Sequence, residues 1–431
     1  MLTPNLTVSE AGRLCFGGAD TVQLAREHGT PLYVMDENTI RENCRGFQRV
    51  IAEEYGGRGL ICYASKALSC KELYRIVDSE GLGADVISGG ELYTAVQAGM
   101  PAEKIVMHGN SKSDAELKMA LDCGVGRIVA DNLPELERLN RIAGEAGKKA
   151  RILLRIKPGI DAHTHDFVKT GCIDSKFGFA LETGEALEAV RAALQYPNLE
   201  LIGLHCHIGS QIFDTEPFAE AARVMVRLMD TIRTECGVTL PELNLGGGPG
   251  IKYTEDDDPP AFGSIVRAIL SALKGCCTAL SFPEPFVLFE PGRSIVGAAG
   301  ITLYTVMAKK VIPGIRTYVL VDGGMCDNPR YALYGSRYEV LIADRAAQPR
   351  SEQVTIGGKC CESGDLIGEN MPLQPAEPGD TLAVLATGAY NYSMASNYNR
   401  NPRAEIVMVK DGAARTVVRR ESYEDIVRND V

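Results

Sequence analysis

The chain contains 431 residues, of which 45% are hydrophobic and 23% charged, and its formal net charge is −11. These are ordinary globular values, and a prior of roughly 150 residues per domain predicts two or three domains. The negative charge and the lack of a lysine- and arginine-rich stripe argue against nucleic acid as a partner.

The first residues show no basic segment followed by an apolar stretch, so we expect no secretory signal. No apolar run approaches the ~18 residues that cross a bilayer, which favours a cytoplasmic protein without a membrane partner. Thirteen cysteines are an odd number in a long chain, and this predicts reduced thiols rather than a disulfide scaffold. No C-x-x-C spacing occurs, which argues against a structural zinc site.

Between about residues 38 and 290, short β-branched runs alternate with apolar residues at helical spacing. The predicted strands are 60–64, 84–87, 104–108, 127–130, 152–156, 201–206, 243–245 and 287–290. Helical patterns cover 37–54, 134–146, 184–194, 217–234 and 261–274. Eight alternating units favour a (β/α)8 TIM-like barrel, with an open doubly wound sheet as the competing interpretation.

After about residue 295 the pattern changes to short apolar and β-branched runs separated by turns. Strands are predicted at 301–306, 317–321, 353–356, 382–386, 405–409 and 415–418, which indicates a mostly antiparallel β domain, a β-sandwich or Greek-key barrel. The N-terminal segment to about residue 33 can add strands to it. The predicted division is therefore a barrel at 36–295 inserted into a β domain of residues 1–35 and 296–431.

Polar and glycine-rich residues collect where the predicted barrel strands end. In such barrels the carboxyl ends of the strands carry the active site. The residues at these ends are Lys66 after the first strand, His108 and Asn110 after the third, Arg155 in the fifth, His207 after the sixth, Gly246, Gly247 and Gly248 after the seventh, and Glu290, Gly292 and Arg293 after the eighth.

Three of these groups suit one kind of site, although each also has a structural interpretation. Lys66 can bond through its neutral amine to an aldehyde, or it can be a solvated charge. The glycines can admit a phosphate to backbone N–H groups, or form only a tight turn. Glu290 can keep a pyridine nitrogen protonated and Arg293 can bind an anion, or the two can form an ion pair.

Paired histidines support a rival interpretation, a metal-dependent barrel hydrolase. His205 and His207 share one face of a predicted strand, and His163 and His165 have the same spacing. A metal would leave Lys66 and the glycines without a purpose. A single imidazole stacked on a flat cofactor accounts for His207 more simply, and we expect no metal.

Together these motifs resemble the fold-type III pyridoxal-phosphate-dependent decarboxylases almost from end to end. In the first 300 residues the resemblance lies in segments 29–33, 63–67, 107–110, 170–171, 175–178, 203–211, 246–250 and 290–293. In the C-terminal part it lies in segments 322–325, 361–365, 388–390, 396–399 and 402–403, with Arg330 and Tyr334.

The resemblance implies a role for each matching residue. Lys66 would carry pyridoxal 5'-phosphate and Glu290 would face its ring nitrogen. The other cofactor-binding residues would be His207, Ser210, Gly247, Gly248, Gly292, Arg293 and Tyr390. Substrate would be bound by Arg293, Arg330, Tyr334, Glu362 and Tyr390, and Cys361 would act as the acid.

The resemblance also implies a homodimer, because the Cys361 segment reaches the site of a neighbouring subunit in such enzymes. Two arginines and Glu362 suit meso-2,6-diaminopimelate, which would yield L-lysine and CO2. The alternatives are decarboxylation of ornithine, lysine, arginine or carboxynorspermidine, an amino-acid racemase, and a binding protein without cofactor. Two residues depart from the family pattern, since Lys157 replaces an expected Asn and Cys360 duplicates the thiol beside Cys361.

Overall fold

The computed structural model describes residues 3–160 and 175–431. They form two compact units, which we name by their architecture. The barrel unit comprises Asn43–Gly250 and Pro259–Gly292, and the β unit comprises Met1–Glu42, Ile251–Asp258 and Arg293–Val431. The predicted histidine pair His163 and His165 and the motif at 170–171 lie outside the described residues.

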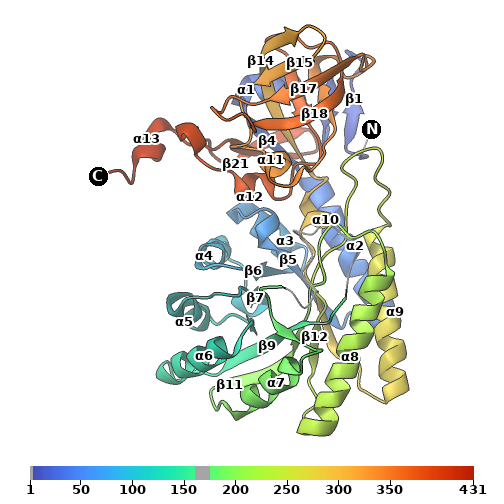
Figure 1. Ribbon diagram of the computed structural model, residues 1–431, viewed down its shortest axis with the longest axis vertical. Coiled ribbons are helices and arrows are strands. Elements are labelled where there is room, and N and C mark those ends of the chain that lie inside the picture. Colours follow the sequence, from blue (N-terminus) through green and yellow to red (C-terminus); the bar gives the residue numbers. More distant parts are fainter. Residues whose placement is uncertain (1–2, 161–174) are drawn as a thin grey trace. The chain divides into compact units, whose positions relative to one another are not determined.

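Eight parallel strands of the barrel unit, within the described residues, close into a cylinder (Figure 1). In chain order they are β5 (Gly59–Ala64), β6 (Gly83–Val86), β7 (Ile105–Met107), β8 (Arg127–Ala130), β9 (Ala150–Lys157), β11 (Leu199–His205), β12 (Glu242–Asn244) and β13 (Phe286–Phe289). Closure comes from β13 pairing with β5 and from β8 pairing with β9. The predicted barrel is confirmed, and the open doubly wound sheet is wrong.

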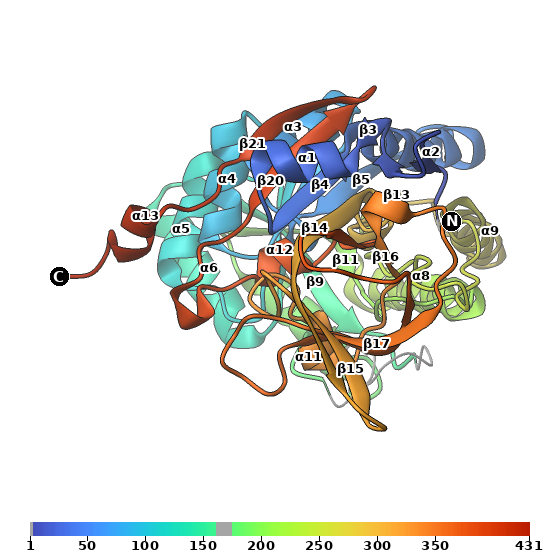
Figure 2. The same cartoon turned by 90° about the horizontal axis from the view of Figure 1, so that it is seen from above.

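Helices follow the strands around the outside of the barrel, and in the view from above α3, α4, α5 and α6 succeed one another (Figure 2). Ser113 begins α5 with a capping box that includes Glu116, and Gly124 ends it in the left-handed conformation. The helices of this layer are α2 (Glu37–Tyr55), α3 (Lys71–Ser79), α4 (Gly89–Ala98), α5 (Asp114–Cys123), α6 (Leu133–Glu145), α7 (Glu185–Gln195), α8 (Glu216–Cys236) and α9 (Phe262–Leu280).

The interior of the barrel is filled by one buried residue from each of six strands, namely Cys62, Val106, Val129, Leu153, Ile202 and Leu288. At the amino ends of the strands, Arg127 donates to both carboxylate oxygens of Glu242, at 2.6 and 2.8 Å. This buried ion pair and the apolar layer close one end of the barrel. The carboxyl ends of the strands therefore remain for the site.

Among the described residues, α9 is the one helix with the length and composition of a membrane span. The expectation of no such apolar run was wrong, because Arg267 and Lys274 are spaced widely enough to leave its hydropathy high. Arg267 pairs with Glu53 and Glu54, and Lys274 donates to the Glu54 carbonyl. The helix also packs along α8, so it has the contacts of an outer-layer barrel helix.

The β unit is built on a mostly antiparallel sheet that includes an N-terminal strand. Strand β4 (Leu32–Asp36) lies between β14 (Gly300–Ile312) and β20 (Glu405–Lys410), as the split β domain requires. The remaining strands are β15 (Arg316–Val321), β16 (Val340–Ile342), β17 (Glu352–Gly357), β18 (Leu366–Leu373), β19 (Thr381–Val384) and β21 (Ala413–Val418). A separate small sheet contains β1 (Leu6–Val8), β2 (Leu14–Phe16) and β3 (Ala19–Asp20).

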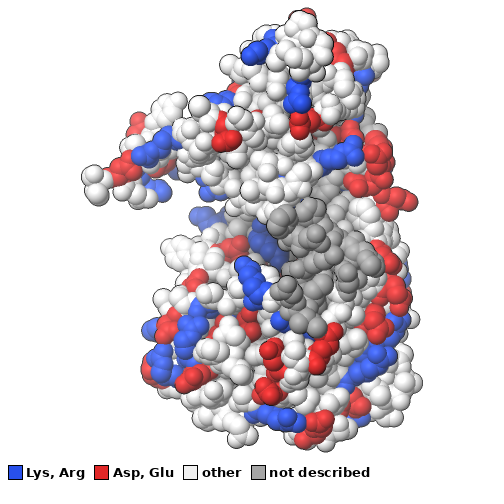
Figure 3. Space-filling view, in the orientation of Figure 1, with Lys and Arg blue, Asp and Glu red and all other residues white. Residues whose placement is uncertain are grey.

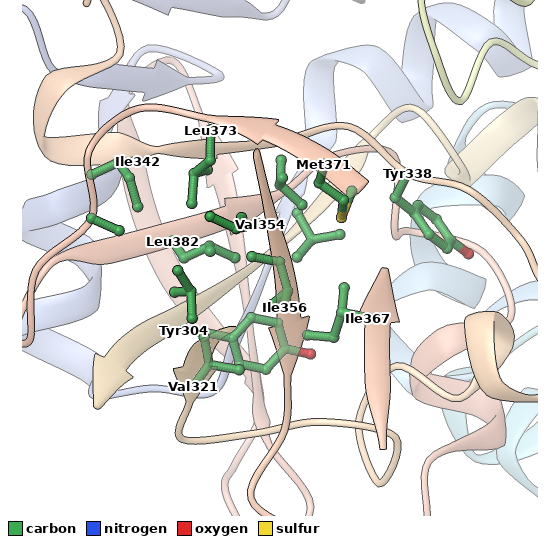
Figure 4. Packing of buried hydrophobic residues seen from close by; sticks show 14 of the residues in the cluster. Tyr304, Val321, Tyr338, Ile342, Val354, Ile356, Ile367, Met371, Leu373 and Leu382 are labelled. Carbon is green, nitrogen blue, oxygen red and sulfur yellow. The ribbon is translucent and has the colours of Figure 1, made fainter. Parts of the chain in front are cut away.

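Apolar side chains from the larger sheet of the β unit point toward one another and form a core (Figure 4). Tyr304, Val354, Ile356 and Leu382 are almost fully buried in this cluster. Glu37, also in the β unit, is buried and accepts hydrogen bonds from three cations, which are Arg41, Lys410 and Arg415. The helices of this unit are short, with bounds of α1 (Thr21–His28), α10 (Arg293–Val296), α11 (Arg330–Tyr334), α12 (Asn391–Met394) and α13 (Tyr423–Val427).

On the face shown in Figure 3, cationic and anionic side chains of the described residues are interspersed. Exposed ion pairs among the described residues include Arg141 with Asp114 at 2.6 Å and Lys118 with Asp122 at 2.6 Å. Such exposed pairs each contribute little to stability.

Candidate active site

Lys66 lies in a tight turn directly after the first barrel strand. Strand β5 ends at Ala64, and Ser65–Ala67 form one turn of 3-10 helix. Gly292, in the loop after β13, packs so closely on this turn that a Cβ there would lie 3.0 Å from the Cβ of Ala64. The first and last strands of the barrel thus hold the half-buried Lys66 between them at the carboxyl end.

Glu290, directly after β13, is a buried carboxylate with both oxygens hydrogen-bonded. Its Oε1 accepts from His108 Nε2 and from Asn244 Nδ2, each at 2.6 Å, and its Oε2 accepts from His205 Nε2 at 3.2 Å. Burial raises the pKa of Glu290, but the two imidazoles outweigh burial and hold it well below the usual value. Burial lowers the pKa of His205 to about 3, so a neutral imidazole donates to an ionised carboxylate.

The glycine run after β12 brings backbone close to backbone. A Cβ on Gly247 would lie 2.1 Å from the Glu290 carbonyl oxygen, and one on Gly248 would lie 2.7 Å from that of Gly209. Gly248 also has φ of +124°, which favours glycine. The Gly247 N–H donates to His207 Nδ1 at 3.3 Å. Ser210 lies on the same loop as His207. The loops after β11 and β12 therefore lie side by side, and we call them the barrel rim.

His207 is held neutral by its surroundings. Burial lowers the pKa of His207, and the positive charges of Lys66 and Arg155 lower it further. A neutral imidazole with an apolar ring face suits contact with a flat aromatic molecule.

In the β unit, two arginines gather over one tyrosine ring. Arg293 lies 4.7 Å and Arg330 lies 5.3 Å from the centre of the Tyr390 ring, measured from the guanidinium carbon. Tyr390 has φ of +68°, an unusual conformation for a tyrosine that places it at the start of α12. Arg293 also donates to the Tyr253 hydroxyl, and Arg330 lies 5.6 Å from the Tyr334 ring. The predicted substrate residues Arg293, Arg330, Tyr334 and Tyr390 are therefore neighbours.

Cys361 and Glu362 lie on a separate, exposed turn of the β unit. Asp365 is buried and fixes this turn by accepting from the N–H groups of Met325 and Cys360, each at 2.6 Å. The Cys361 N–H donates to Asn399 at 2.8 Å. Cys360 is buried, and burial raises the pKa of its thiol, whereas Cys361 is exposed. The two neighbouring thiols therefore differ sharply in access to solvent.

The metal interpretation paired His205 with His207. Among the described residues, the group that comes close enough to hold an ion is His108, His205 and Glu290, and it does not include His207. His108 Nε2 and Glu290 Oε1 lie 2.6 Å apart, at hydrogen-bond distance.

A barrel with a lysine, a buried carboxylate and a glycine run at the carboxyl ends of its strands defines a class of cofactor enzyme. The model of the family "Pyridoxal-dependent decarboxylase, pyridoxal binding domain" matches residues 37–297. Diaminopimelate decarboxylase from Bacillus subtilis (strain 168) is 48% identical over 98% of this chain and 96% of its own length. The Bacillus methanolicus enzyme of the same name is 49% identical over 96% of each chain.

A solved structure agrees with these relatives. Diaminopimelate decarboxylase from M. jannaschii, in complex with L-lysine, has a TM-score of 0.92 and 34% identity over 100% of this chain and 99% of its own. The chain belongs to the pyridoxal-dependent decarboxylases and, within them, to the diaminopimelate decarboxylase family.

The barrel residues fit pyridoxal phosphate. Gly247 and Gly248 have no room for a Cβ, because backbone carbonyls lie close to them, and glycine-rich backbone turns of this kind commonly bind phosphate. The ionised Glu290 suits a protonated pyridine nitrogen, and the neutral His207 suits its ring. Lys66 lies in the turn that follows β5, and its charge acts on His207.

His108 was placed with the residues at the strand ends but given no role, and Asn244 was not among the predicted site residues, although both hydrogen-bond Glu290. The signal was available for His108, because it directly follows β7 at the end of the barrel where polar residues gather. Asn244 is the last residue of β12 and precedes the glycine run.

Proposed function

We propose that this chain converts meso-2,6-diaminopimelate to L-lysine and CO2, the last step of lysine biosynthesis, as a cytoplasmic homodimer. The observation that carries the proposal is the 48% identity, over almost the whole chain, to a relative with this named activity. The chemistry of the barrel rim described above is in accord with it.

The barrel residues hold the cofactor. Lys66 would hold its aldehyde through Nζ, and His207 would cover the ring. Gly247, Gly248 and Ser210 hold the phosphate, with Gly292 keeping the Lys66 turn in place. When bound, pyridoxal phosphate would supply an acceptor for the electron pair that CO2 leaves on the α-carbon. The negative charge of Glu290 would lie at the ring nitrogen and favour that acceptance.

The β-unit residues recognise the substrate and return a proton. Diaminopimelate has a second amino-acid centre that must be held without reacting. Arg330 and Arg293 provide guanidinium groups for carboxylates, Glu362 provides a carboxylate for an ammonium group, and Tyr334 and Tyr390 position the chain between them. The family resemblance also assigns Tyr390 and Arg293 to cofactor binding. Cys361 holds a proton on Sγ and delivers it to the carbon that has lost CO2.

The exposure of Cys361 and Glu362 supports a role at a neighbouring subunit's site. In that arrangement each active site takes its acid from the partner chain, which makes the dimer obligatory. The barrel then serves as the cofactor-binding domain, and the β unit as the domain for substrate binding and dimer formation.

The substrate is tested by CO2 release. We expect the purified enzyme with pyridoxal phosphate to release CO2 from meso-diaminopimelate far faster than from lysine, ornithine or arginine. Preference for any of these three amino acids would contradict the assignment. Borohydride reduction of the coloured enzyme should fix the cofactor on a peptide that contains Lys66, and a label on another lysine would contradict its role.

The shared site is tested by mixing two variants of low activity, Lys66→Ala and Cys361→Ala. If the acid comes from the partner, random reassociation should restore about a quarter of wild-type activity, because half of the dimers contain one intact site of two. Each variant alone, dissociated and reassociated in the same way, is the control. An inactive mixture of folded, reassociated subunits would place Lys66 and Cys361 of one chain in the same site.

A further inference from the structure

Glu290 accepts hydrogen bonds from three side chains of the barrel unit. A buried carboxylate needs partners to remain charged, and three side chains of the barrel unit supply them. Their positions differ, since Asn244 ends the neighbouring strand β12, His205 ends β11, and His108 reaches in from beyond β7. His108 forms one of the two shortest bonds and is itself buried.

The hydrogen-bond pattern fixes which way the protons point. His205 Nδ1 is buried and has no hydrogen-bond partner among the described residues. A neutral imidazole carries one N–H, and with Nδ1 unpartnered that N–H belongs on Nε2, where it faces Glu290. The ring of His108 packs edge-on against that of His205, with 4.7 Å between ring centres. Each imidazole therefore limits the rotation of the other.

A second carboxyl group gives His108 a further effect. Asp85 is buried, and one of its oxygens lies 3.8 Å from His108 Nε2. Burial raises the pKa of Asp85, and His108 opposes that rise. His108 thus lies between two buried carboxyl groups, with its short hydrogen bond directed at Glu290.

We propose that His108 is a positioning residue that, with His205 and Asn244, keeps the Glu290 carboxylate fixed and ionised toward the cofactor ring nitrogen. The inference rests on the proposed role of Glu290. Loss of the His108 donor leaves the carboxylate with two donors, which stabilise its ionised form less than three donors do. The protein then loses part of its preference for a ring that carries a protonated nitrogen.

Two ligands that differ at a single ring atom test this proposal. In 1-deazapyridoxal phosphate a C–H group replaces the ring nitrogen, so an ionised Glu290 gives it no advantage. The measured quantity is the ratio of its dissociation constant to that of pyridoxal phosphate, from titration of the apoenzyme. Damage to the barrel weakens both ligands alike and leaves the ratio unchanged, whereas loss of the fixed charge lowers it.

We expect His108→Leu to lower the ratio about tenfold, the effect of one hydrogen bond to a charged group. His108→Gln, which keeps an N–H donor at similar reach, should restore most of the ratio. Met107→Ala is the matched control, because Met107 is the buried apolar neighbour on β7, and it should leave the ratio unchanged. An unchanged ratio in His108→Leu would overturn the proposal.

Two further results keep the test decisive. If His108→Leu does not fold, His205→Met removes the longer bond of the same group, and we expect a ratio about threefold lower than wild type. A wild-type ratio in that variant would equally overturn the proposal. Failure of the proposed function would give a different result, because the wild-type enzyme would then not bind pyridoxal phosphate or not release CO2 from diaminopimelate.

Discussion

The buried ion pair between Lys112 and Glu135 offers a sharp test of the electrostatics of the barrel. Both side chains are 0% exposed, and Lys112 Nζ lies 2.7 Å from Glu135 Oε1. Lys112 Nζ also donates to the carbonyls of Gly109, at 2.6 Å, and Val129, at 2.8 Å. Lys112→Met removes all three bonds while keeping most of the side-chain volume.

The magnitude follows from the charge that is left behind. Breaking a buried pair by removing one partner costs about 3–5 kcal/mol, because the other charge stays buried without compensation. Replacing both partners by apolar residues is far less costly. We therefore expect Lys112→Met to lower the free energy of unfolding by about 4 kcal/mol, and Lys112→Met with Glu135→Met to recover at least about half of that loss.

Urea unfolding followed by circular dichroism measures these differences from the shift of the barrel transition. Lys118→Met on α5 is the control, because Lys118 and its partner Asp122 are 63% and 49% exposed and the pair should contribute less than about 1 kcal/mol. A Lys112→Met protein as stable as the control would refute the reasoning. So would a double variant that is less stable than Lys112→Met.

Three further outcomes are expected. Burial raises the pKa of Glu37, but its three cations outweigh burial and lower this pKa to about 2. The stabilisation by ionised Glu37 is therefore present above pH ~4.5 and is lost as the pH falls toward 2. Glu37→Gln should lower the free energy of unfolding by roughly 2–3 kcal/mol at pH 7 and by almost nothing near pH 2, measured by denaturation at each pH. Cys361→Ala should slow CO2 release at least about tenfold with the cofactor still bound, whereas an equal loss in Cys360→Ala would move the acid role. Gly247→Ala should weaken cofactor binding at least about tenfold in a titration, because its Cβ would lie 2.1 Å from the Glu290 carbonyl oxygen. Unchanged affinity would contradict the proposed role of Gly247 in holding the phosphate.

The barrel could be predicted because its strands are apolar runs that end in unusual residues. Lys66 and Glu290 were predicted as site residues from their places at strand ends, and the structure shows that β5 ends at Ala64 and β13 at Phe289, just before them. Strand β18 was not predicted, because its sequence contains Gly368, Asn370 and Pro372 and lacks alternation. Its pairing with β17 shifts register near these residues, and Asn370 takes a left-handed conformation.

Contacts between distant segments could not be read from the sequence. Nothing local indicates that His108 reaches Glu290 or that Arg330 lies over Tyr390, since these pairs form only when strands or loops far apart in the chain meet. Sequence alone also gave no physical basis for choosing between Cys360 and Cys361. The difference in burial that the structure shows for these two thiols supplies one.

The position of β4 has a consequence for how the chain is made. This strand leaves the ribosome early, yet its neighbours β14 and β20 are synthesised only after the entire barrel sequence. All five of its residues, Leu32–Asp36, are buried in the finished sheet, so until then it is a nascent apolar strand with two unpaired edges. A chain that terminates before β14 would thus contain a barrel preceded by an exposed apolar strand, and chaperones bind such exposed apolar segments.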